Sequence, residues 1–212
     1  MSLAEIKDQL FTILIAGHET TAVSIAWAAY FLIREPAVRE RLRRELASVP
    51  PGDLDAIRKL PYLDAVCSET LRIEPAVTDV ARVCTKPFAL GPYTVPAGEC
   101  VFVNTCMLHK DDALYPEPDR FRPERFLDRT YRPFEFTPFG GGQRRCLGAA
   151  FAQAELALAV ACLVRDWELA LEGDAPEVAV RRNITMGPKR GVRVRVVERR
   201  TRTTANEGRA AS

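Results

Sequence analysis

Apolar residues recur at helical spacing through the first part of the chain and predict one long helix. They occupy positions 3, 6, 10, 13 and 14 and continue beyond, so one face of the segment is apolar at a period of 3.6 residues. Ser2 and Glu5 have the spacing of a capping box, which marks a helix start. Because Pro36 cannot continue a helix, we expect this helix to end near Arg34.

The rest of the pattern predicts shorter helices and a few antiparallel strands. Helices are expected over 36–48, over 62–73, from about 108 and over 147–163, with at most a turn or two in 53–59. The helix over 147–163 is apolar nearly all round, which is typical of a buried helix. Alternating residues predict a hairpin across 90–104 and strands over 167–171 and 192–197. The fold class is therefore mainly α with small β hairpins (α+β).

Composition and charge are those of an ordinary globular protein. The 212 residues are 47% apolar and carry a formal net charge of +2. The last fourteen residues hold four arginines against one glutamate, or +3, so the body is near −1. No basic field therefore favours nucleic acid. We expect one folded unit over 1–198 and a disordered polar tail over 199–212.

The sequence gives no sign of a secreted or membrane protein. Acidic residues near the start replace the basic region of a signal peptide. His18 and Glu19 interrupt the long apolar stretch, so we expect no membrane span. A cytoplasmic location is the resulting expectation.

A glycine-rich turn leads into Cys146, which precedes the Ala/Leu-rich helix. A helix N-terminus and two preceding arginines favour the thiolate, the metal-binding form of cysteine. Glycines allow backbone to approach a flat ligand closely. These residues suit a thiolate held against a large planar anion such as haem. The alternative is a plain loop with Cys146 as a small buried apolar residue.

The stretch Phe139 to Gly148 resembles the cysteine-ligand signature of the cytochrome P450 superfamily, Phe-x-x-Gly-x-Arg-x-Cys-x-Gly. Phe139, Gly142, Arg144, Cys146 and Gly148 match it at fixed spacing. The resemblance implies haem b with Cys146 as the axial thiolate ligand of its iron. It also implies that Phe139 packs beside the sulfur and that Arg144 reaches a haem propionate.

A polar segment, residues 16–21, interrupts the long N-terminal helix. Gly17 costs about 1 kcal/mol relative to alanine in a helix interior, and the threonine hydroxyls can bond back to helix carbonyls. Taken alone, the segment also fits a small-residue packing notch. It resembles the family's oxygen-binding helix, Ala-Gly-x-(Asp/Glu)-Thr-Thr. The resemblance implies that Ala16 and Gly17 lie over the haem, that Thr20 hydrogen-bonds the bound oxygen, and that Glu19 belongs to the proton-delivery path.

Glu69 and Arg72 lie three residues apart on one helix face, as in an ordinary surface ion pair. They also resemble the family's Glu-x-x-Arg pair. The resemblance implies that this pair is buried behind the haem and completed by Arg125, which lies in Phe121-Arg122-Pro123-Glu124-Arg125-Phe126.

Further positions carry only the roles that the resemblance implies. Arg82 lies where a propionate-binding arginine is common in the family. The expected substrate-pocket residues come from two segments: Val77, Thr78, Asp79 and Val80 from the first, Ile184 and Thr185 from the second.

The resemblance begins at the oxygen-binding helix and covers only the C-terminal half of the family fold. It implies a haem-thiolate monooxygenase of soluble bacterial type that inserts one atom of O2 into a small apolar organic substrate. An external electron donor is expected, either a ferredoxin with its reductase or a flavin reductase. The chain is then a truncated segment with a missing N-terminal half. Alternatives are a catalytically incompetent haem-binding fragment, one half of a split enzyme, or a zinc module of Cys100, Cys106 and His109.

Overall fold

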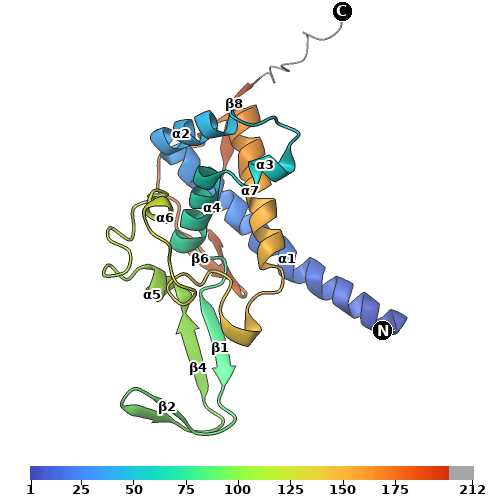
Figure 1. The fold of residues 1–212 in the computed structure, drawn as a ribbon, viewed down its shortest axis with the longest axis vertical. Coiled ribbons are helices and arrows are strands. Elements are labelled where there is room, and N and C mark those ends of the chain that lie inside the picture. Colours follow the sequence, from blue (N-terminus) through green and yellow to red (C-terminus); the bar gives the residue numbers. More distant parts are fainter. Residues whose placement is uncertain (201–212) are drawn as a thin grey trace, which may run out of the picture.

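The computed structural model describes residues 1–200, which form a helical body with four two-stranded sheets (Figure 1). The helices are α1 (Leu3–Arg34), α2 (Pro36–Leu46), α3 (Leu54–Ile57), α4 (Pro61–Ile73), α5 (Thr105–His109), α6 (Arg125–Asp128) and α7 (Ala149–Asp166), with a 3-10 turn at Gly142–Arg144. The strands are β1 (Asp79–Val83), β2 (Phe88–Leu90), β3 (Tyr93–Val95), β4 (Cys100–Asn104), β5 (Trp167–Leu171), β6 (Ala179–Arg182), β7 (Thr185–Pro188) and β8 (Val194–Arg199).

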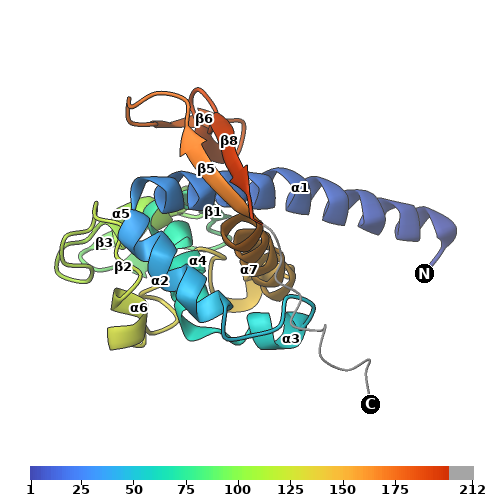
Figure 2. The ribbon, with the colours of Figure 1, turned by 90° about the horizontal axis from the view of Figure 1, so that it is seen from above.

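Helix α1 begins and ends as its sequence predicts. The Ser2 side chain accepts from the Glu5 backbone N–H, and the Glu5 carboxylate accepts from the Ser2 N–H, which completes the capping box. The first half of α1 projects away from the body (Figure 2), and its buried residues begin only at Thr21. The apolar side chains of the first half therefore remain exposed, while Trp27 in the second half is buried.

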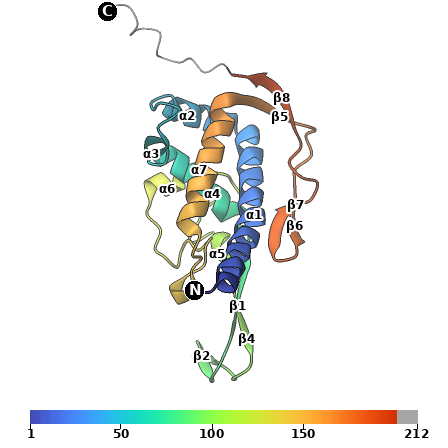
Figure 3. The same cartoon turned by 90° about the vertical axis from the view of Figure 1, so that its right-hand side faces the viewer.

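The core lies where the second half of α1 meets α2, α4 and α7. Figure 3 shows α1 beside α7, with the sheets β5–β8 and β6–β7 on the opposite side of α1 from the other helices. Fully buried aliphatic residues of this core include Leu42, Leu63 and Val160. Strand β7 packs against α1, so the sheets and the helices hold α1 from both sides.

The predicted hairpin across 90–104 is only partly right. Strands β2 and β3 do form a short hairpin about Gly91, which has φ of +56°. Strand β4, however, pairs antiparallel with β1, with Asp79 opposite Asn104. Together β1 and β4 form an arm that leaves the body, with β2 near its tip (Figure 1).

Several helix and strand boundaries also differ from expectation. The short helix expected from residue 108 is α5, which begins at Thr105 because Asn104 caps its start by accepting from the Met107 N–H, and which ends at His109. The helix after Cys146 begins at Ala149. Strand β8 runs through Arg199, and the Arg200 N–H donates to the Asp166 carbonyl. The rest of the predicted tail, 201–212, lies outside the described residues.

The expectation that α7 is buried all round is wrong for this chain. One face packs in the core, but Phe151 keeps 75% of its surface exposed. The pattern of apolar residues on both faces predicts a helix with neighbours on both sides, and the described residues cover one side only.

Helix α1 is long and apolar enough to cross a membrane by length and composition, the one helix of which this holds among the described residues. The sequence predicted that His18 and Glu19 exclude a membrane span, but by these criteria they do not. A core helix meets the same criteria, and the second half of α1 has that role here.

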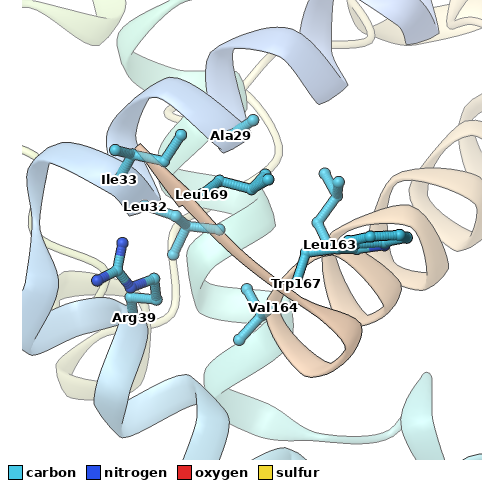
Figure 4. Close-up of a pocket in the computed structure, with 8 residues that line it drawn as sticks. All are labelled: Ala29, Leu32, Ile33, Arg39, Leu163, Val164, Trp167 and Leu169. Atoms are coloured by element: carbon cyan, nitrogen blue, oxygen red, sulfur yellow. The ribbon is translucent and has the colours of Figure 1, made fainter. Parts of the chain in front are cut away.

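A small apolar cavity lies where the ends of α1 and α7 meet β5 (Figure 4). Leu32, Leu163 and Trp167 contribute to its wall, with Arg39 at one side. Its volume of about 20 Å³ admits at most one water molecule. This cavity is therefore too small for a ligand larger than water.

Candidate functional site

The loop before α7 presents Cys146 by means of a fixed backbone turn. Gly140 and Gly142 have φ of +69° and +65°, values that favour glycine. The Cys146 N–H donates to the Phe139 carbonyl at 2.9 Å. Because Gly148 is the N-cap of α7, Cys146 lies two residues before the cap rather than in the first turn. Its sulfur still lies near the helix start, 3.9 Å from the position of a Cβ on Gly148.

The surroundings of Cys146 fit a large ligand that covers them. Cys146 is exposed and is a free thiol. Leu147 is 99% exposed, and within the described residues no ion pair or hydrogen bond engages the exposed Arg144 guanidinium. An exposed thiol beside exposed apolar side chains and an unpaired cation suits a flat, apolar group with anionic edges.

The polar segment of α1 faces an open groove. The Thr20 hydroxyl donates to the Ala16 carbonyl at 2.8 Å, one turn earlier, which leaves its oxygen free to accept another hydrogen bond. A Cβ on Gly17 would meet nothing within 4 Å. Close packing within the described residues therefore does not explain this glycine. A packing notch needs a neighbouring element against Gly17, and residues 1–200 place none there.

Thr185 connects this segment of α1 to the β6–β7 hairpin. Its hydroxyl lies 2.8 Å from Glu19 Oε1 and 2.9 Å from the Arg182 carbonyl oxygen. Thr185 itself is buried, whereas Ile184 beside it is exposed. The groove is lined by α1 and this hairpin turn, with Asp8, Phe11, Thr12, Ile15, Ala16, Glu19, Thr20, Asn183, Ile184 and Thr185. Thr185 contributes to this wall through a hydrogen bond to Glu19, a contact that the sequence did not indicate.

Glu69, Arg72 and Arg125 form a buried ion cluster, so the surface-pair alternative is wrong. Their side chains are 0%, 0% and 4% exposed. Arg72 donates to both oxygens of Glu69 at 2.7 and 3.0 Å, and Arg125 Nε donates to Oε1 at 3.0 Å. The remaining guanidinium hydrogens reach backbone carbonyls such as those of Pro116 and Pro118. The cluster thereby fixes the segment between α5 and α6 against α4.

Asp79 is held between three strands. It accepts from Thr78 Oγ1 at 2.9 Å, Asn104 Nδ2 at 2.7 Å and Arg181 Nη2 at 2.6 Å. These hydrogen bonds, Arg181 first, lower the pKa of the Asp79 carboxyl. Asp79 therefore connects β1 to β4 and β6, and Arg181 and Asn104 are partners that the sequence did not reveal.

The neighbouring predicted residues are less constrained. Val77 and Val80 are half-buried beside the buried Thr78, and the Ala76 carbonyl accepts from the Met186 N–H at 2.8 Å. This bond brings the two predicted pocket segments together. Arg82 is exposed on β1 and, among the described residues, its side chain donates only to the adjacent Ala81 carbonyl.

The zinc alternative finds no site in residues 1–200. No group of three or more His, Cys, Asp or Glu side chains there could hold a metal ion. His109 is fully buried, and protein atoms engage both of its ring nitrogens.

Known proteins resemble this chain in sequence and in structure. The family model for cytochrome P450 matches residues 1–193. Cytochrome P450 135B1 of Mycobacterium tuberculosis is 40% identical over 92% of this chain and 41% of its own length. Mouse cytochrome P450 4V2 is 31% identical over 94% of this chain and 39% of its own length.

Solved structures agree with this. Retinoic acid-bound cyanobacterial CYP120A1 has a TM-score of 0.85 at 32% identity, covering 93% of this chain and 47% of that one. The cytochrome P450DA heme domain has a TM-score of 0.85 at 30% identity, covering 94% and 45%. The chain thus spans less than half the length of these relatives.

Proposed function

Because the chain belongs to the cytochrome P450 family and has the C-terminal part of its fold, we propose that it is the haem-binding segment of a haem-thiolate monooxygenase. The reaction is the insertion of one oxygen atom from O2 into a small apolar organic substrate. The observation that carries this proposal is the exposed Cys146 thiol on its glycine-rich turn, beside exposed Leu147 and the unpaired Arg144.

Four features of the chain would hold haem b. Cys146 would supply the thiolate ligand, Arg144 and Arg82 would supply cations for the propionates, and Gly17 would leave room for the ring. Haem with a thiolate ligand activates O2, because the thiolate donates electron density that favours cleavage of the O–O bond. The exposure of both arginines supports their role, since neither guanidinium is committed to a carboxylate within residues 1–200.

Glu19 and Thr20 are the proposed proton-handling residues. The Thr20 hydroxyl gives its hydrogen to the Ala16 carbonyl, so its oxygen can accept a hydrogen bond from a ligand or a water in the groove. The Glu19 carboxylate, one residue earlier in the same groove, can take up a proton from solvent and pass it on. A positioned acid and hydroxyl of this kind contribute about 10²–10⁴-fold to a proton-transfer step.

Val77, Val80 and Ile184 are the proposed apolar contacts of the substrate, at a site completed by protein outside this chain. The proposed electron donor is a separate ferredoxin with its reductase or a flavin reductase, and the proposed location is the cytoplasm.

The test joins the chain to the N-terminal part of the 40%-identical relative P450 135B1 and supplies haem, a reducing system and ¹⁸O2. We expect a panel of apolar organic compounds to include one that gains a single ¹⁸O atom. In the Thr20→Ala variant, more of the consumed electrons should appear as hydrogen peroxide. Haem binding without label incorporation into any compound would contradict the monooxygenase assignment.

A second proposed function is that of a haem-binding fragment that needs a partner chain. The exposed apolar half of α1 and the exposed Phe151 favour it, since such surface is usually covered. We expect the chain alone to bind haem without turnover, and turnover to appear when the N-terminal part is added as a separate polypeptide. Turnover by the chain alone at an equal rate would contradict this.

A further inference from the structure

His109 makes a set of contacts that a neutral imidazole alone can satisfy. Its Nε2 lies 3.0 Å from the Thr137 backbone nitrogen, whose N–H is the donor, so Nε2 must be unprotonated. Its Nδ1 lies 3.2 Å from the Arg72 carbonyl oxygen, which can only accept, so Nδ1 must carry the hydrogen. The geometry thus selects one tautomer of the neutral ring.

These contacts place His109 between the buried ion cluster and the cysteine loop. Arg72 Nη1 donates to the His109 carbonyl at 2.7 Å, so Arg72 contacts this residue twice. On the other side, Thr137 lies two residues before Phe139, whose carbonyl accepts the Cys146 N–H. The ring also stacks on Phe136, with centroids 5.4 Å apart.

We propose that His109 is a positioning residue for Cys146: it transmits the fixed position of Arg72 to the loop that presents the thiol. The consequence for ligation rests on the proposed function, whereas the hydrogen-bonded connection does not. Any loss of the Nε2 contact leaves the buried Thr137 N–H without a partner, which costs more than an ordinary hydrogen bond contributes. The loop before Cys146 should then loosen.

The surroundings of the ring favour the neutral form. Burial lowers the pKa of His109 to about 4; the hydrogen bond to the Arg72 carbonyl opposes this shift, and the Arg72 charge adds to it. The titratable and charged groups that face it are Arg72 from α4 and Tyr115, whose ring lies 5.9 Å away. Burial raises the pKa of Tyr115, so Tyr115 stays neutral too. At neutral pH the connection is therefore intact.

The first test uses the chain alone, without haem. It has only two histidines, and His18 is exposed. Nitrogen-15 NMR of the His109 ring should show protonated Nδ1 and unprotonated Nε2 from pH 8 to pH 5. The Thr137 amide should be protected from exchange and lose that protection as His109 is protonated near pH 4. A ring with Nε2 protonated at neutral pH, or a Thr137 amide that exchanges freely, would overturn the proposal.

The second test compares variants after haem is added. His109→Phe keeps a flat ring but removes both polar contacts, and His109→Gln restores an acceptor near the position of Nε2. Tyr115→Phe is the control, because it removes a hydrogen bond to the Glu135 carbonyl from the same aromatic cluster. Exchange of the Thr137 amide should accelerate roughly tenfold or more in His109→Phe, less in His109→Gln, and little in Tyr115→Phe.

The fraction of haem with a thiolate ligand is measured from the carbon monoxide spectrum of the reduced protein. It should fall most in His109→Phe, less in His109→Gln and little in Tyr115→Phe. Equal losses in His109→Phe and Tyr115→Phe would show a merely structural role and overturn the proposal. If no variant, including the parent, gives a thiolate spectrum, the proposed function fails while the tautomer and amide measurements still decide the connection. Should His109→Phe not fold, the tautomer of the parent decides the hydrogen-bonded connection, and His109→Gln decides its effect on ligation.

Discussion

At the scale of single residues, the buried carboxylate of Glu69 accepts four hydrogen bonds. It accepts from Arg72, from Arg125 and from the Arg122 backbone N–H. Placing an acid and two guanidiniums in the interior carries a large desolvation cost, so their net contribution to stability is small compared with the effect of removing one partner. The cluster is therefore best understood as fixing one arrangement of its segments.

Glu69→Ala should lower the free energy of unfolding by about 3–5 kcal/mol, because it leaves two buried guanidiniums without their anion. Chemical denaturation measured by circular dichroism checks this. Glu40→Ala is the matched control, since it breaks an exposed ion pair with Arg43 and should cost under about 1 kcal/mol. Similar losses in both variants would contradict a special role for the buried cluster.

Glu74 makes the stability of the fold fall as pH rises, because its pKa is raised, whereas His109 makes it rise, because its pKa is lowered. Burial raises the pKa of Glu74 to about 7 from 4.5, so the folded state holds a proton that the unfolded state releases. Its contribution is thus full below about pH 4.5 and is lost as pH rises through 7. Glu74→Gln should leave stability at pH 4.5 nearly unchanged and raise it at pH 8 by about 1–3 kcal/mol. Denaturation curves at both pH values would measure this, and equal stability of the two proteins at pH 8 would contradict it.

Thr185 has one hydroxyl hydrogen for two acceptors, Glu19 and the Arg182 carbonyl. In Glu19→Gln the amide can donate to the Thr185 oxygen, so both contacts can be made at once. We expect that variant to unfold at the same or slightly higher denaturant concentration. Thr185→Val should cost about 1 kcal/mol. A double-mutant cycle checks the coupling, and additive effects would show that the two side chains do not interact.

At the scale of elements, local signals predicted helices well and strand partners poorly. The capping box at Ser2 and the proline at position 36 bound α1 because each acts within one turn of chain. Strand β4 forms within the expected segment, but its partner β1 lies about twenty residues earlier and not across the nearest turn. Pairing at that separation depends on where α4 and α5 place the two strands, which no local pattern contains.

The candidate site shows the same division. The buried pair of Glu69 and Arg72 could be predicted because its spacing matches a known family signature, and the role of Cys146 stays a prediction from the same kind of match. His109, Arg181 and Asn104 could not, because each acts through partners distant in sequence, such as Thr137 for His109 and Asp79 for the other two. A buried histidine in a short helix gives no sequence signal of which atoms its nitrogens will meet.

Substitution of Gly17 in α1 should change stability and haem binding in opposite directions. Since a Cβ there meets nothing within 4 Å, Gly17→Ala should stabilise the chain by up to about 1 kcal/mol through helix propensity. The same Cβ would occupy space proposed for the ring and should weaken haem binding. Denaturation and haem titration measure the two effects. Gly52→Ala, in a turn that is equally open, should leave haem binding unchanged; unchanged binding in Gly17→Ala would contradict the placement.

At the scale of the whole molecule, residues 1–200 leave two apolar surfaces uncovered. The exposed face of α1 and the outer face of α7 are apolar, and the chain spans 41% of P450 135B1. The sequence predicted α7 to be covered on both faces, and a longer chain would satisfy that pattern. The ion cluster, His109 and the cysteine loop are joined by hydrogen bonds within residues 1–200.

The central claim is that Cys146, among six cysteines, is the thiolate ligand of haem. The most direct measurement is the carbon monoxide difference spectrum of the reduced, haem-loaded chain and of its six single Cys→Ser variants. We predict the strongly red-shifted Soret band of a thiolate complex in the parent and in five variants, and its loss in Cys146→Ser alone. Persistence of that band in Cys146→Ser, or its absence from the parent in the presence of bound haem, would contradict the account.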